Sequence, residues 1–179
     1  MVYVFLADGF EEIEALTTVD ILRRAEIETL TVGVGGISVV GSHGIKVSAD
    51  ILDSEAVFSD LEMIILPGGM PGTLNLEACE TVNKFIDYSY KNNLWIAAIC
   101  AAPSILGHKG LLREKRAVCY PGFENHLEGA TVCDKQVVVD GKIITARGMG
   151  AALDFSLELL SLLKGKDTAD KMQEAICKI

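Results

Sequence analysis

The chain has 179 residues, and half of them are hydrophobic. That length suffices for one well-buried core and is short for two, so we expect a single domain over residues 1–179. The formal net charge is −9, from 16 Lys and Arg residues against 25 Asp and Glu residues. Such a chain repels phosphate backbones on average, so nucleic-acid binding is not expected.

The start of the chain predicts a strand rather than a targeting segment. Residues 1–7 are apolar, but no basic stretch precedes them and they run directly into Asp8 and several glutamates, unlike a signal peptide. No apolar run approaches the length that spans a membrane. The scattered cysteines contain no C-x-x-C pair, so we expect reduced thiols, a cytoplasmic protein and no metal site. The five are Cys79, Cys100, Cys119, Cys133 and Cys177.

Strands and helices alternate along the chain. Residues 2–7 and 28–34 are apolar runs of strand length, and apolar residues recur between them at helical spacing, which predicts a βαβ unit. Asp140-Gly141 predicts a type I′ turn. The later predicted elements are a hairpin over 37–48, a strand over 63–66, helices over 77–90 and from Cys100 to 108, a strand over 94–99, a hairpin over 137–146, and helices over 151–163 and 168–177.

This alternation predicts an α/β protein: a flavodoxin-like three-layer sandwich with a mostly parallel central sheet. In such folds the site lies at the carboxyl ends of the strands. Three strand ends carry residues of chemical interest, namely Asp8 to Glu14, Pro67-Gly-Gly69 and Cys100. We therefore expect these three segments to meet at one edge of the sheet.

Cys100 ends an apolar strand and precedes small residues and a helix. A residue at such a strand-to-helix elbow is held exposed, and nearby backbone N–H groups lower the pKa of a thiol there. The alternative is a buried core cysteine, because free cysteine is among the most buried residue types. We favour the reactive thiol.

The acidic segment and the glycine pair each have two interpretations. Glu11 and Glu12 favour the N-terminal end of a helix, whereas Glu14 lies on a face that can turn towards the sheet and hydrogen-bond to a thiolate. Their charge excludes a flavin phosphate at this loop. Gly68-Gly69 is either a simple turn or a source of backbone N–H groups for an oxyanion. No cofactor is expected.

Three histidines add one further alternative. A Cys100/His126 dyad is allowed by residue type, but a solvated loop histidine is favoured for His126. His43 lies in the predicted hairpin and His108 near a helix end.

Five motifs together resemble the ThiJ/PfpI superfamily, in the branch of the parkinsonism-associated protein and its bacterial relatives. The resemblance covers nearly the whole chain, and the motifs stand in the family's order. They are Ala7-Asp-Gly-Phe-Glu-Glu-Ile-Glu14, Leu66-Pro-Gly-Gly69, Ala97-Ala-Ile-Cys-Ala-Ala-Pro103, Cys119-Tyr-Pro-Gly122 and Thr145-Ala-Arg-Gly148.

The resemblance implies a homodimer and an oxidation-prone cysteine in a strained elbow. It places the family's cysteine at Cys100, its partner glutamate at Glu14, and its backbone donors at Gly69 and Ala101. It also implies pocket residues, namely Gly68, Tyr120, Pro121 and Gly148.

Three departures from the family pattern bear on function. Tyr120 stands where the human-type members have histidine, which leaves Glu14 as the main proton carrier. Ala101 stands where the peptidase branch has histidine, so a peptidase is disfavoured. Met149-Gly-Ala151 replaces the usual Pro-Gly-Thr, which alters the pocket rim.

Two functional hypotheses follow from the resemblance. The first is a cofactor-free glyoxalase or deglycase that acts on 2-oxoaldehydes such as methylglyoxal and glyoxal, or on their protein adducts, in stress protection. The second is a redox sensor or chaperone whose Cys100 is oxidised to a sulfinate. The sequence favours the enzyme, because an acid/base residue beside a nucleophile is the arrangement that catalysis needs.

Overall fold

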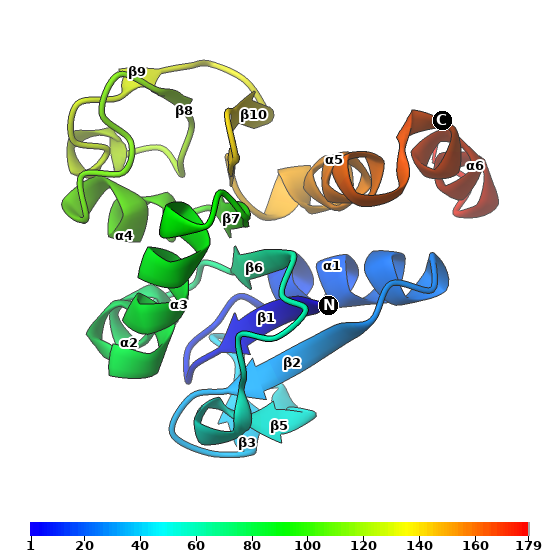
Figure 1. The fold of residues 1–179 in the computed structure, drawn as a ribbon, viewed down its shortest axis with the longest axis horizontal. Helices are drawn as coiled ribbons and strands as arrows, with labels where there is room; N and C mark the ends of the chain where they lie inside the picture. The colour runs from blue at the N-terminus through cyan, green and yellow to red at the C-terminus, as the bar shows by residue number, and fades with distance from the viewer. Residues whose placement is uncertain (179) are drawn as a thin grey trace.

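The computed structural model describes residues 1–178 and shows a seven-stranded sheet between two layers of helices (Figure 1). The strand order is β10-β11-β7-β6-β1-β2-β5, and all neighbouring pairs are parallel except β10 and β11. This order confirms the predicted flavodoxin-like fold. The strands are β1 (Val2–Leu6), β2 (Thr29–Gly33), β5 (Ile51–Leu52), β6 (Met63–Leu66), β7 (Trp95–Ile99), β10 (Val137–Asp140) and β11 (Ile143–Ala146).

Helices cover both faces of the sheet, because strands such as β1 bury side chains on both faces. Alternate residues of a strand point to opposite faces, and both faces of β1 are buried, so its sequence is apolar throughout. Val2, Val4 and Leu6 pack against α1 (Glu12–Arg24), α5 (Ala152–Lys164) and α6 (Lys166–Ala175). On the other face, Tyr3 and Phe5 belong to the core that includes α3 (Glu80–Lys91) and α4 (Pro103–His108).

Short elements complete the fold around the sheet. The predicted hairpin is confirmed as β3 (Ser38–Val40) paired antiparallel with β4 (Lys46–Ser48). The others are β8 (Arg116–Ala117), which pairs in parallel with β9 (Thr131–Val132), and the 3-10 turns η1 (Asp53–Glu55), η2 (Glu124–His126) and η3 (Met149–Ala151).

Two local predictions were wrong. The helix expected over 77–90 is two helices, α2 (Gly72–Ala78) and α3, because Cys79 between them is extended. The β10–β11 turn is centred on Gly141-Lys142, and of these two only Gly141 has a positive φ. A type I′ turn needs positive φ at both central residues, so this one is of the II′ kind.

None of the helices in the described part of the chain is both long enough and apolar enough to cross a membrane.

Candidate active site

Cys100 occupies the turn between β7 and α4, as predicted. Its φ is +65°, in the left-handed region that non-glycine residues adopt at a cost. Two backbone hydrogen bonds hold the residue in this conformation: its N–H donates to the Ala146 carbonyl at 2.9 Å, and its carbonyl accepts from the Tyr120 N–H at 2.8 Å. The neighbouring segments therefore supply the interactions that maintain the strained elbow.

Gly68 and Gly69 follow β6, the strand beside β7, and bring backbone close to the cysteine. A Cβ on Gly68 would lie 2.6 Å from Cys100 Cβ and 2.8 Å from Glu14 Oε2, so only glycine fits between these two side chains. Gly69 has a φ of +89°, which glycine adopts readily. The backbone N–H groups of Gly69 and Ala101 lie near enough to the Cys100 sulfur to lower the pKa of its thiol.

Glu14 comes from the first turns of α1 and points into the protein, with only 1% of the residue exposed. Its Oε2 accepts a hydrogen bond of 2.9 Å from the Gly68 N–H. Its Oε1 is buried without a hydrogen-bond partner within residues 1–178, and the Cys100 side chain is near enough to the carboxyl to influence its pKa. Burial raises the pKa of Glu14 to about 7, although the contacts with Cys100 and Gly68 lower it in part.

The pKa of the Cys100 thiol is raised to about 12, which is opposite to the direction expected from the elbow alone. Burial is the largest cause, the Glu14 carboxylate is the next, and hydrogen bonds from Ala101 and Gly69 oppose both. Because each negative charge disfavours the other, the two groups titrate as a pair. Above about pH 7 the pair therefore carries one negative charge, and a proton moved from sulfur to Glu14 creates the thiolate.

The pocket residues expected from the resemblance differ in how much they are exposed. Gly148 is buried, and a Cβ there would lie 3.8 Å from Cys100 Sγ and 3.2 Å from the Tyr120 ring. Tyr120 is exposed, and its backbone N–H donates to the Cys100 carbonyl. Pro121 is exposed in the following turn.

The histidines pair with other groups. His126 Nδ1 lies 3.0 Å from His108 Nε2, and His108 Nδ1 lies 2.5 Å from Glu77 Oε1. His108 and His126 therefore form a separate polar cluster at the surface with Glu77.

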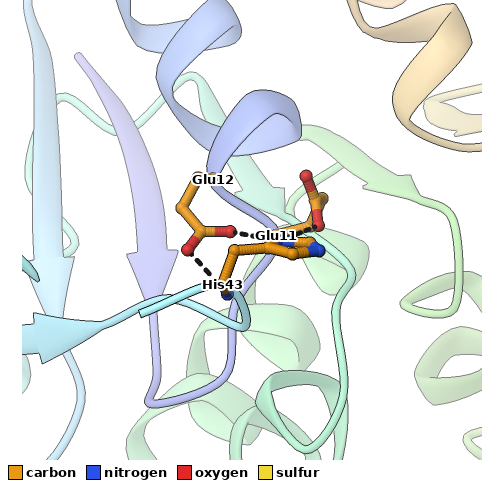
Figure 2. Close-up of side chains that lie close together, drawn as sticks. All are labelled: Glu11, Glu12 and His43. Carbon is orange, nitrogen blue, oxygen red and sulfur yellow. Dashed lines mark hydrogen bonds and ion pairs between the residues drawn. The ribbon is translucent and has the colours of Figure 1, made fainter. Parts of the chain in front are cut away.

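Glu11 and Glu12 behave differently from each other. Glu11 caps α1, because its side chain accepts from the Ile13 N–H, as the helix-end interpretation predicted. Glu12 is buried and binds His43 of the β3–β4 loop (Figure 2). Burial opposes its ionisation, but hydrogen bonds from His43 and Ile45 outweigh burial and lower the pKa of Glu12 to about 2. Sequence reasoning missed this pairing, because nothing in the local sequence places the loop that carries His43 beside the start of α1.

The fold and these contacts define a class: a flavodoxin-like α/β protein with a cysteine at a strand-to-helix elbow and a buried glutamate against it. Residues 1–162 match the DJ-1/PfpI family, and the chain belongs to that family.

Individual relatives agree with this assignment. Protein DJ-1 homolog B of Arabidopsis thaliana is 39% identical over 94% of this chain and 39% of its own length. Glutathione-independent glyoxalase DJR-1.2 of Caenorhabditis elegans is 29% identical over 93% of this chain and 90% of its own. The structure of oxidized Toxoplasma gondii DJ-1 superposes with a TM-score of 0.94 at 33% identity, covering 98% of this chain and 97% of the other. The chain spans less than half the length of the two Arabidopsis relatives.

Proposed function

We propose that the chain is a cofactor-free enzyme that converts small 2-oxoaldehydes, such as methylglyoxal and glyoxal, or their protein adducts, by means of Cys100 and Glu14. One observation carries the proposal: a buried carboxyl lies against a thiol at an elbow, with backbone N–H groups on the same sulfur. A nucleophile, a proton carrier and oxyanion donors are the three parts that this chemistry needs. The glyoxalase name of the Caenorhabditis relative supports this choice of substrate.

The reaction begins when Glu14 accepts the Cys100 proton and the thiolate attacks the aldehyde carbon. Glu14 returns the proton to the new alkoxide, which gives a neutral hemithioacetal, while the Gly69 and Ala101 N–H groups stabilise the transient negative charge. The Glu14 carboxylate then removes the hydrogen from this carbon and delivers it to the adjacent carbon. The hydroxyl proton of the hemithioacetal passes to the former ketone oxygen, which leaves a thioester of the 2-hydroxy acid. Water cleaves the thioester and releases the acid and the thiol, so methylglyoxal and water together yield lactate.

A direct assay tests this proposal. Fully reduced protein is incubated with methylglyoxal, and loss of aldehyde and formation of lactate are followed beside Cys100→Ala. We expect lactate formation that Cys100→Ala abolishes and that Cys177→Ala, a change at an exposed cysteine, leaves intact. Full activity in Cys100→Ala would contradict the mechanism, and no turnover by the reduced wild type would contradict the function.

The second candidate is a redox sensor or chaperone, and the donors on the Cys100 sulfur favour it. Two equivalents of peroxide convert the thiolate into a sulfinate and release two waters, and the Gly69 and Ala101 N–H groups would bind the sulfinate oxygens. Mass spectrometry after mild peroxide treatment tests this: oxidation confined to the other cysteines would contradict it.

We also propose that the chain acts as a single domain and as a homodimer, as the resemblance implies. Both core clusters share the strands of one sheet, which supports the single domain. Ile13, Met149 and Leu153 are exposed apolar residues on α1, η3 and α5, and α1 contacts α5. These residues support a self-association surface on that face.

A further inference from the structure

A second cluster of ligating side chains lies where the start of α1 meets the β3–β4 loop (Figure 2). His43 Nδ1 lies 2.9 Å from Glu12 Oε2 and 3.3 Å from Glu11 Oε2. The ligand atoms of the three residues all lie within 4.8 Å of one another. Two carboxylates and an imidazole nitrogen from two separate elements thus converge on one point.

The two carboxylates are anchored by backbone donors. Glu12 Oε1 accepts from the His43 N–H at 2.8 Å, and Glu11 Oε1 accepts from the Ile13 N–H at 3.4 Å. The Oε2 atoms of both face Nδ1, and the Ser42 hydroxyl lies within hydrogen-bonding distance of each, at 3.2 Å from Glu11 Oε2 and 3.3 Å from Glu12 Oε2. Carboxylates that ligate metals in proteins are likewise held in place by hydrogen bonds from surrounding groups.

Burial distinguishes this cluster from ordinary surface acids. The Glu12 side chain is only 3% exposed and that of Glu11 only 14%, whereas the His43 ring is 70% exposed. Gly41 supplies the space, because a Cβ there would lie 2.2 Å from Glu12 Oε1. The two carboxylates are therefore buried and held in place. The exposed imidazole leaves one side of the cluster open to an ion and its water.

Charge favours a divalent ion over a proton at this cluster, and the distances are compatible with an ion. An imidazolium brings one positive charge to two carboxylates and leaves one negative charge without compensation, whereas a dication with neutral imidazole leaves none. Bonds of about 2.0 to 2.1 Å place neighbouring ligand atoms about 2.9 Å apart around an octahedral ion and about 3.4 Å apart around a tetrahedral one. The two separations to Nδ1 lie in this range.

We propose that Glu11, Glu12 and His43 form a binding site for a divalent first-row transition-metal ion, separate from the cysteine chemistry. Nitrogen and oxygen ligands in this ratio suit Zn²⁺, Co²⁺ and related ions. The ion replaces the proton on Nδ1 and keeps water in its remaining positions. Because the Glu11 N–H donates to the Gly68 carbonyl at 2.9 Å, the bound ion also steadies the loop beside Cys100.

Titration of the reduced full chain with Co²⁺, followed by absorption spectroscopy, tests the site. We expect one equivalent to bind with d–d bands and without the sulfur-to-cobalt charge-transfer band of a thiolate site. His43→Ala and Glu12→Gln should each weaken binding by about tenfold or more. The matched controls, Glu28→Gln at an exposed glutamate and His108→Ala in the other histidine cluster, should bind as the wild type does.

A thermal melt gives a second readout. Co²⁺ should raise the melting temperature of the wild type and of both controls but not of His43→Ala, which changes an exposed side chain and so leaves the fold intact. Wild-type affinity in His43→Ala would overturn the proposal, as would a thiolate charge-transfer band that disappears in Cys100→Ala. Failure to bind millimolar Co²⁺ would show that the cluster is an ion pair only.

Discussion

Cys100 and Glu14 lie far apart in the sequence and meet because β7, β6 and β1 are neighbours in the sheet. Each of these strands delivers one part of the site at its carboxyl end: Cys100 after β7, Gly68 after β6, and Glu14 in the helix after β1. Gly68 lies between the other two and leaves no room for a side chain. At the scale of single residues, activity therefore depends on what occupies these three positions.

Replacing Gly68 by Ala should damage the site without unfolding the protein. The new methyl group would overlap Cys100 and Glu14, and overpacking of this kind costs about 1 to 3 kcal/mol. Displacement of the reacting groups should lower the rate of lactate formation by about a hundredfold. Gly150→Ala is the control, because nothing lies within 4 Å of a Cβ there. Equal activities in the two variants would show that Gly68 is not required for positioning.

Replacing Glu14 by Gln should make the Cys100 thiol more reactive and at the same time slow turnover. After burial, the Glu14 carboxylate is the largest cause of the raised pKa of Cys100. Removing its charge lowers that pKa, increases the thiolate fraction near neutral pH, and should accelerate alkylation of Cys100 by iodoacetamide, read by mass spectrometry. Lactate formation should nevertheless fall by about a hundredfold or more, because the proton carrier is gone. Slower alkylation of the variant would contradict the assigned role of the carboxylate.

At the scale of elements, Asp50 secures the edge of the sheet. It precedes β5, and one carboxylate oxygen accepts from the Thr31 N–H and hydroxyl of β2, both at 2.7 Å, and from Arg23 of α1. Burial by itself would raise the pKa of Asp50, but these contacts outweigh it and hold the pKa below its usual value. A single carboxylate thus joins β2, β5 and α1.

Asp50→Asn should lower the free energy of unfolding by about 1 to 3 kcal/mol, the range for hydrogen bonds to a charged group. A carboxyl whose folded-state pKa is depressed stabilises the fold above its unfolded pKa of about 3.9 and loses that effect as the pH falls through the folded value. The difference between wild type and variant in urea unfolding should therefore be full at neutral pH and shrink in acid. A difference in unfolding free energy that does not change with pH would show that Asp50 stabilises the fold through packing rather than through its charge.

At the scale of the whole molecule, the apolar residues around α1 and α5 should bury themselves between two copies of the chain. Val2 and Phe5 are fully buried core residues and take no part in this surface, whereas Ile13 is exposed. Ile13→Asp should convert a dimer into a monomer, as measured by light scattering coupled to size exclusion. Leu74→Asp, at an exposed leucine of α2, should remain dimeric. A monomeric wild type would contradict the dimer.

Much of the fold was predictable because its signals are local. The apolar runs of β1, β6 and β7 gave their strands, and Gly41 to Gly44 gave the β3–β4 hairpin, within a residue or two. The prediction of one continuous helix failed because side-chain contacts interrupt it at a point that the apolar pattern does not mark. Asn83, for example, binds the Glu77 and Cys79 carbonyls at the break between α2 and α3, which the apolar pattern does not reveal.

The sequence by itself determined the alternation of strands and helices, the elbow that carries Cys100, and the family to which the chain is similar, because period, turn residues and motif order are properties of neighbouring residues. Only the tertiary structure decided that Glu14 raises the pKa of the Cys100 thiol, that His126 joins His108, and that Glu12 meets His43. These outcomes depend on strand order and on burial, which determine how strongly charges interact across the fold. Residues distant in the chain acquire their chemistry only when the sheet brings them together.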